Sequence, residues 1–320
     1  MSLIYFLFRQ TLYFAIPLMI VALAGMFSER SGVVNIALEG IMIFGAFFGV
    51  YFIHFMQLNG TMSGMPFLFC ALLVAGFVGG IFGLLHAFAS VTLKADQTIS
   101  GTALNMLAPA FGLFFAKTTL DGVSQVLFSN EFRITAVPGL SSIPVIGDLF
   151  FKNCYVTTLL GIIILIGSWF VMYKTKFGLR IRACGENPHA ADAAGINVIK
   201  TRYISVIISG ILGGIGGLIY VIPIATEFES DVAGYGFLAM AVLIFGNWKP
   251  WRIAGAAFFF GLMKTLSYSY TSIGFLNALN MPGVVYKLIP YVATLIVLVI
   301  TSKDSQGPRA SGVPYDKSSR

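Results

Sequence analysis

A carboxylate and a carboxamide stand one helical turn apart in an apolar stretch near the start of the chain. Asn35 and Glu39 are four residues apart, so a helix would place both on one face. Together they offer donors and acceptors to a hydroxyl-rich solute. A charge inside a membrane costs about 3 kcal/mol or more unless it faces a cavity or a partner. We therefore expect either a solute pathway here, or a structural break in which Glu39 bonds a backbone N–H or pairs with Arg30.

A second polar face occurs in the apolar stretch 97–117. Thr98, Thr102 and Asn105 recur at helical spacing, and Pro109 follows one turn later as an expected kink. In lipid, such groups either hydrogen-bond to a neighbouring helix or line water. These three residues join the first pair as candidates for a solute pathway.

The remaining reactive residue types are not arranged for catalysis. The sequence has no paired acids, no nucleophile elbow and no Gly-x-x-x-x-Gly-Lys-Ser/Thr loop that would cradle the phosphates of ATP. We therefore expect no enzyme active site, no metal and no cofactor. The histidines and cysteines lack metal-ligand spacing; they are His54, His86, His189, Cys70, Cys154 and Cys184.

Composition indicates a membrane protein. Of 320 residues, 57% are hydrophobic and 10% charged, with a mean hydropathy of +0.87, whereas soluble domains carry about 25% charged residues. The apolar residues form blocks of about 20, enough for a helix to cross roughly 30 Å of hydrocarbon. The net charge of +7 comes from bases between these blocks, which indicates topology and not a nucleic-acid surface. We predict an all-α fold, a polytopic transmembrane helical bundle of about 8–10 membrane helices.

Nine apolar segments carry this prediction. The fourth opens with polar residues and the seventh is short, so either could be a broken or re-entrant helix. All belong to one permease domain, residues 1–302, followed by a polar tail, 303–320, that we expect to be disordered in the cytoplasm. The segments are 11–27, 32–53, 66–89, 97–117, 155–173, 203–222, 234–247, 252–268 and 286–301.

Charges in the loops predict the orientation. The loop 174–202 is rich in lysine and arginine and is therefore expected to be cytoplasmic. The next loop holds Glu227, Glu229 and Asp231 without a base, which suits the outer side. Counting back places the N-terminus and the loop 118–154 outside, unless one segment is re-entrant.

A short helix is well marked inside the loop 174–202. Asn187 is a favoured N-cap, Pro188 suits the first helical position, and Gly195 can take the left-handed conformation that ends a helix. About two turns are marginal in water alone, so the helix must dock on something. Its alanines could enter a groove on a soluble partner, or the helix could lie on its own membrane domain.

Four stretches, in their order along the chain, resemble one family. They read E-R-S-G-V-V-N-I-A-L-E-G at 29–40, D-Q-T-I-S-G-T-A-L-N at 96–105, G-L-R-I-R-A-C-G-E-N-P-H-A-A-D-A-A-G at 178–195, and I-F-G-N-W-K-P at 244–250. The third looks like the cytoplasmic coupling loop of bacterial ABC-importer permeases of the branched-chain amino acid and ribose type. The other three resemble the nucleoside and simple-sugar branch of that family.

This resemblance implies a division of labour in the bacterial plasma membrane. The chain would form the path for the solute, while a P-loop ATPase, a second permease and an extracellular solute-binding lipoprotein would be its partners. It implies nucleosides as the solute, with simple sugars as the alternative; a self-powered secondary carrier remains the rival class. The residues expected to couple to the ATPase are Gly185, Glu186, Asn187, Pro188, Ala190, Ala191, Ala194 and Gly195.

Overall fold

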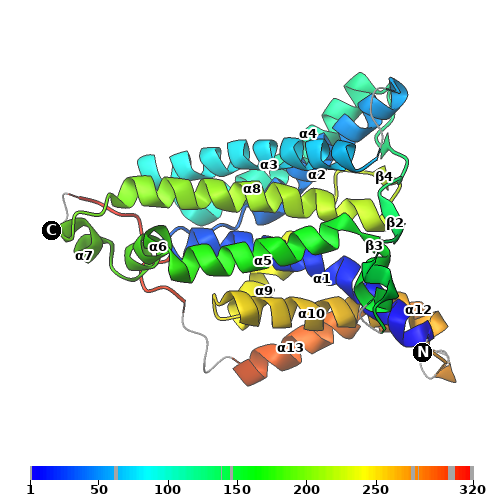
Figure 1. Ribbon diagram of the computed structural model, residues 1–320. Coiled ribbons are helices and arrows are strands. Elements are labelled where there is room, and N and C mark those ends of the chain that lie inside the picture. The colour runs from blue at the N-terminus through cyan, green and yellow to red at the C-terminus, as the bar shows by residue number, and fades with distance from the viewer. Residues whose placement is uncertain are drawn as a thin grey trace.

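The helices of the chain run side by side between two ends of the molecule (Figure 1). Short strands lie at one end, and the C-terminal residues lie at the other beside α7 (Pro188–Ala193). This arrangement comes from a computed structural model that describes residues 2–60, 64–137, 139–144, 147–274, 278–279, 281–301 and 307–317.

Each of the nine predicted apolar segments contains a helix. In the described part of the chain, six helices are long and apolar enough to cross a membrane, namely α1, α2, α3, α4, α5 and α8. The multi-pass helical fold is therefore confirmed, and the shorter or more polar α9, α10 and α13 accompany these six. The bounds are α1 (Ser2–Glu29), α2 (Leu38–Leu58), α3 (Met65–Ala87), α4 (Gln97–Thr119), α5 (Val156–Lys174), α6 (Lys176–Glu186), α8 (Val198–Ile224), α9 (Tyr235–Phe245), α10 (Pro250–Tyr268), α12 (Gly283–Lys287) and α13 (Ile289–Thr301), with π-helical turns at Phe88–Thr92 and Gly147–Phe151 and 3-10 turns at Leu140–Ser142 and Tyr270–Ser272.

Helix α8 lies at the centre of the bundle and packs against α1, α2 and α3. Glycines bring its backbone close to two of these neighbours. A methyl group added to Gly210 would lie 2.3 Å from the carbonyl oxygen of Gly79 on α3, and one added to Gly217 would lie 2.1 Å from that of Met42 on α2. Such close approach holds helices together in lipid, where burial of apolar surface supplies little drive.

Two small antiparallel sheets close the end opposite α7. Strand β1 (Val126–Leu127) pairs with β4 (Glu227–Phe228), and β2 (Arg133–Ala136) pairs with β3 (Lys152–Tyr155). These strands belong to the two loops that the charge pattern assigns to the outer side. Because β1 and β4 come from different loops, their pairing joins the α4–α5 connection to the α8–α9 connection.

The loops that carry the motifs meet at the other end, which the charge pattern assigns to the cytoplasm. Residues after α1 contact the residues around α7, since Arg30 faces Glu186. Lys94, between α3 and α4, contacts Asp316 in the tail. This end therefore includes the C-terminal end of α1, and the start of α1 lies at the opposite end, near the strands (Figure 1). That the start of α1 is on the outer side remains a prediction of the charge pattern.

Two apolar segments differ from continuous membrane helices. The second was expected to start at residue 32, but residues 33–35 are non-helical and α2 begins only at Leu38. The seventh, α9, has 11 residues and therefore spans about 16 Å, roughly half of a hydrocarbon layer. The broken form considered for the seventh segment is thus what the structure has, whereas α4 runs as one helix through Pro109.

The polar tail also differs from the disordered segment expected from its composition. Residues 307–317 pack on the cytoplasmic end, where the Ala310 N–H donates to the Gly185 carbonyl at 2.8 Å and the Gly312 N–H donates to the Gly32 carbonyl at 3.1 Å. Backbone groups make these bonds, so side-chain polarity gave no indication of them.

Candidate solute pathway and coupling surface

Side chains from two neighbouring helices satisfy the backbone at the break before α2. The Val34 N–H donates to the Gln97 side-chain oxygen at 2.7 Å, and Nε2 of His86 lies 3.0 Å from the Val34 carbonyl, to which it donates. Non-helical backbone at membrane depth is tolerated only where protein or water supplies such partners. The break is therefore built into the fold by α3 and α4, and His86 serves backbone pairing.

Asn105 spans the same break from α4. Its Nδ2 donates to the Ile36 carbonyl at 2.8 Å, and its Oδ1 accepts from the Gly40 N–H at 2.7 Å. Asn35, directly before Ile36 in the chain, is fully buried, and its Nδ2 donates to the Ser209 hydroxyl of α8 at 2.9 Å. Both amides thus bond within the protein, one to the backbone and one across helices.

The carboxylate of Glu39 binds the N-terminal end of α9. It accepts from the N–H groups of Gly234 at 2.9 Å, Gly236 at 2.5 Å and Phe237 at 3.3 Å. Unpaired N–H groups and the helix dipole make a helix N-terminus favourable for a negative charge. This is the structural alternative left open for Glu39, and it places the charge where α2 and the short helix α9 begin. Discontinuous helices whose N-termini meet at the midplane are typical of transporter substrate sites.

A cleft of about 490 Å³ opens beside this junction, between α9, α10 and α13. Its volume suits a small organic solute. Lys264 lines it, with Nζ 5.7 Å from the ring centroid of Tyr235 and 5.3 Å from that of Tyr268. The sequence reasoning passed over Lys264, although a lysine inside the segment 252–268 is itself a functional signal. The cleft is lined by Ala233, Gly234, Phe237, Leu238, Ala241, Lys264, Pro290, Tyr291, Thr294 and Leu295.

Thr98 and Thr102 do not join this group. Both are exposed on the face of α4 that points away from the bundle, and the Thr102 hydroxyl donates to the Thr98 carbonyl at 2.7 Å. The structure therefore gathers Asn35, Glu39 and Asn105 around the break and leaves the two threonines apart from it.

The short helix predicted in the cytoplasmic loop is confirmed as α7. Asn187 precedes it and accepts from the Ala190 N–H at 3.0 Å, and Pro188 occupies its first position. Gly195 follows with a φ of +80°, in the left-handed region. The local capping rules alone thus determine where this helix begins and ends.

Helix α7 and its flanks present two faces. One faces the permease: Ala191 is 4% exposed, and a methyl group added to Gly185 would lie 2.2 Å from the Arg30 carbonyl oxygen. The other face is open to a partner. The predicted coupling residues therefore divide into an inner set, Gly185, Pro188 and Ala191, and an exposed set, Glu186, Asn187, Ala190, Ala194 and Gly195.

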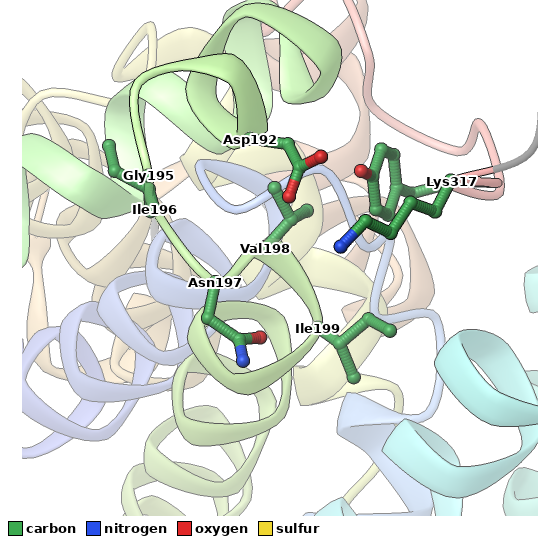
Figure 2. Close-up of a pocket in the computed structure, with 8 residues that line it drawn as sticks. Asp192, Gly195, Ile196, Asn197, Val198, Ile199 and Lys317 are labelled. Carbon is green, nitrogen blue, oxygen red and sulfur yellow. The ribbon is translucent and has the colours of Figure 1, made fainter. Parts of the chain in front are cut away.

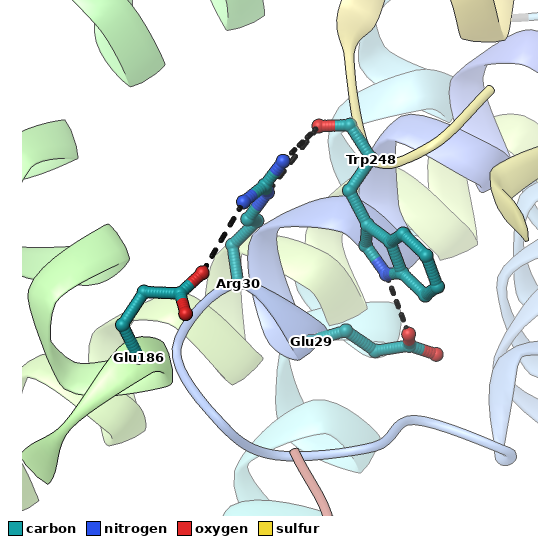
Figure 3. Close-up of polar contacts among 4 residues, drawn as sticks. All are labelled: Glu29, Arg30, Glu186 and Trp248. Atoms are coloured by element: carbon teal, nitrogen blue, oxygen red, sulfur yellow. Dashed lines mark hydrogen bonds and ion pairs between the residues drawn. The ribbon is translucent and has the colours of Figure 1, made fainter. Parts of the chain in front are cut away.

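Three of the motifs meet beside α7 in one polar network (Figure 3). Arg30 lies 3.9 Å from the Glu186 carboxylate and donates to the Trp248 carbonyl through Nε at 3.4 Å and Nη2 at 3.3 Å. The Trp248 indole N–H donates to the Glu29 carboxylate at 2.7 Å. Burial lowers the pKa of Arg30 from its usual value. The network joins the coupling loop to the ends of α1 and α9.

The sequence matches the family described as "Branched-chain amino acid transport system / permease component" over residues 7–299. The guanosine ABC transporter permease protein NupQ of Bacillus subtilis is 46% identical, covering 97% of this chain and 96% of its own length. The nucleoside ABC transporter permease protein NupC of Lactococcus lactis is 41% identical over 96% and 95% of the two chains. The glucose ABC transporter permease protein TsgB13 of Haloferax volcanii is 24% identical over 96% and 79%.

Proposed function

The chain belongs to the family of branched-chain amino acid transport system permease components, and on that premise we propose that it carries nucleosides through an ABC importer. As a permease it is not the ATPase, and it works with an ATPase and a solute-binding protein. We further propose that a second permease completes the path and that the binding protein is an extracellular lipoprotein.

The choice of nucleosides rests on one observation. Two relatives at 46% and 41% identity, aligned over nearly the whole chain, are described as guanosine and nucleoside permeases. Two relatives described as glucose permeases, the putative TsgC13 and TsgB13, are 29% and 24% identical, so simple sugars remain the second candidate.

We assign the solute path to the junction of α2 and α9 and to the cleft beside it. Glu39 and Asn105 fix the backbone of the junction, and the cleft supplies apolar surface for a base together with the Lys264 ammonium as a donor. The Thr294 hydroxyl donates to the Pro290 carbonyl, so its oxygen serves as an acceptor. In this assignment Glu39 and Asn105 position the path and leave solute contact to the cleft. The exposed Thr98 and Thr102 carry no part in it.

Helix α9 can carry motion between the two ends of this system. Its C-terminal end leads to Trp248, which Arg30 holds beside the coupling loop, while its N-terminal end is held by Glu39. A displacement of α7 by the ATPase would pass through Arg30 and Trp248 to α9 and would shift the wall of the cleft. Such rigid movement of short elements is an ordinary route for switching access in transporters.

The test is uptake by the reconstituted importer. Liposomes holding the permeases and the ATPase, supplied with ATP and the binding protein, should accumulate labelled guanosine, and excess unlabelled nucleoside should compete while glucose and ribose do not. Competition by the sugars alone would select the second candidate. Uptake by this chain without the ATPase would instead identify a self-powered carrier and would overturn the proposal.

A further inference from the structure

Residues 307–317, which we call the strap, cross the cytoplasmic end next to α7. A methyl group added to Gly307 would lie 3.1 Å from the Trp248 ring, so the strap starts against the network of Figure 3. Its backbone then bonds the Gly185 and Gly32 carbonyls. The strap thus holds the turn after α1 and the start of the coupling loop together.

A buried arginine hydrogen-bonds to the middle of the strap. Arg202 of α8 is 1% exposed, and its guanidinium donates to the Ser31 carbonyl at 3.1 Å and to the Val313 carbonyl at 3.0 Å. A buried charge is costly unless hydrogen bonds satisfy it. Seating of the strap therefore supplies one of the acceptors that this charge needs.

The end of the strap covers the inner face of α7. Tyr315 packs with Cys184, Ala191 and Val198 in one apolar cluster, and its ring centroid lies 5.2 Å from that of His189. One residue on, Asp316 accepts from the Lys94 ammonium at 2.7 Å. The strap is thus the second wall, besides α8, against which α7 rests.

Strap and coupling loop enclose a hollow of about 420 Å³ that opens at the surface. Asp192 of α7 and Lys317 of the strap flank it, and Asn197 and Ile199 lie on the side away from Asp192 (Figure 2). Gly195 belongs both to this hollow and to the exposed face of α7. The hollow therefore continues the exposed coupling face without a break.

We propose that the strap is part of the ATPase docking surface: α7 and residues 315–317 form one composite surface, whose hollow receives a polar side chain of the ATPase. This rests on the proposed function, because it takes the exposed face of α7 to be where the ATPase binds. Opposite charges at the two rims, Asp192 and Lys317, suit a side chain that can both donate and accept hydrogen bonds. The strap adds to α7 a contact that a helix of two turns lacks.

The first test changes charge without touching the packing. Lys317→Glu reverses one rim of the hollow, and Lys176→Glu is the matched control, an exposed lysine of α6 outside the hollow. Binding of the purified ATPase to the permease in detergent should weaken by about tenfold in Lys317→Glu and stay at the wild-type value in the control. Equal affinities for wild type and Lys317→Glu would overturn the composite surface.

Cys184 reports whether the strap is seated. It is fully buried under Tyr315 and Ala191, and burial raises the pKa of its thiol, so it should resist maleimide. With Cys70→Ser and Cys154→Ser as background, Cys184 should stay unlabelled in the full chain and in Lys317→Glu. In Tyr315→Ala, or in a chain ending at residue 306, maleimide should label Cys184, and the affinity for the ATPase should fall. Labelling of the full chain at the truncated chain's rate would show that the strap does not cover α7.

Ala190→Arg separates failure of this inference from failure of the proposed function. If Ala190→Arg releases the ATPase while Lys317→Glu and the truncated chain bind it as wild type does, α7 docks alone and the strap has no part. If Ala190→Arg also binds normally, the coupling surface itself is misplaced, and the composite surface falls with it.

Discussion

The indole N–H of Trp248 donates a 2.7 Å hydrogen bond to the carboxylate of Glu29, across 219 residues of sequence. Both side chains are at most 9% exposed, so the carboxylate depends on this donor. Trp248→Phe keeps the apolar ring and removes the N–H, which should lower the free energy of unfolding by about 1–3 kcal/mol. Thermal melting of the purified permease measures this. Trp251→Phe, at a ring that is 56% exposed, should leave the melting temperature unchanged, and an equal loss in both variants would contradict the role of the bond.

Glu39→Gln should destabilise the permease as well as slow uptake. A glutamine side chain has one acceptor oxygen, and its NH2 group would face N–H donors at the start of α9. We expect a loss of about 1–3 kcal/mol. The matched control is Glu227→Gln, at an exposed carboxylate in β4. A wild-type melting curve combined with lost uptake would instead show that Glu39 contacts the solute directly.

The two faces of α7 predict opposite effects of the same substitution. Ala190 is exposed, so Ala190→Arg should abolish ATPase binding and leave the melting temperature of the isolated permease unchanged. Ala191 is buried against Cys184 and Tyr315, so Ala191→Arg should lower that temperature even without the ATPase, since it forces a charge into a packed cluster. Pull-down and melting on both variants check this. Destabilisation by Ala190→Arg would mean that this face rests on the permease.

Close packing of α3 on α8 predicts a large effect from one methyl group. In Gly210→Ala the new carbon would lie 2.3 Å from the Gly79 carbonyl oxygen, and backbone at both sides prevents easy relief. We expect a loss of about 1–3 kcal/mol. Gly167→Ala on α5, where no atom lies within 4 Å of the added carbon, should not lower the melting temperature. Equal melting temperatures for the two variants would show that the helices can separate at no cost.

Elements that obey a local rule could be predicted from the sequence. Apolar length locates the six long membrane helices of the described residues, because about 20 residues are needed whatever the neighbours are. Asn187, Pro188 and Gly195 mark the ends of α7 because each acts on backbone within three residues of itself. The need of Glu39 for a partner could also be predicted, since a charge in an apolar segment requires one.

The partners themselves could not be predicted, because they come from distant parts of the chain. Trp248 beside Lys249 and Pro250 resembles an interfacial aromatic residue, yet it is 7% exposed against Glu29. Residues 33–37 are apolar except for Asn35 and therefore look like part of a helix. Gln97, His86 and Asn105 stabilise their non-helical backbone by hydrogen bonds. The packing of the strap could not be predicted for the same reason, since backbone groups make its hydrogen bonds to distant residues.

The bond between Glu39 and Gly234 also sets an order of events during synthesis. The two residues are separated by 195 positions, so at about 5–20 residues per second a ribosome needs roughly 10–40 s between them. For that time α2 holds a carboxylate whose N–H donors have not yet been made. A nascent α2 that stays beside water or an insertion factor during that time avoids the cost of an unpaired carboxylate in lipid.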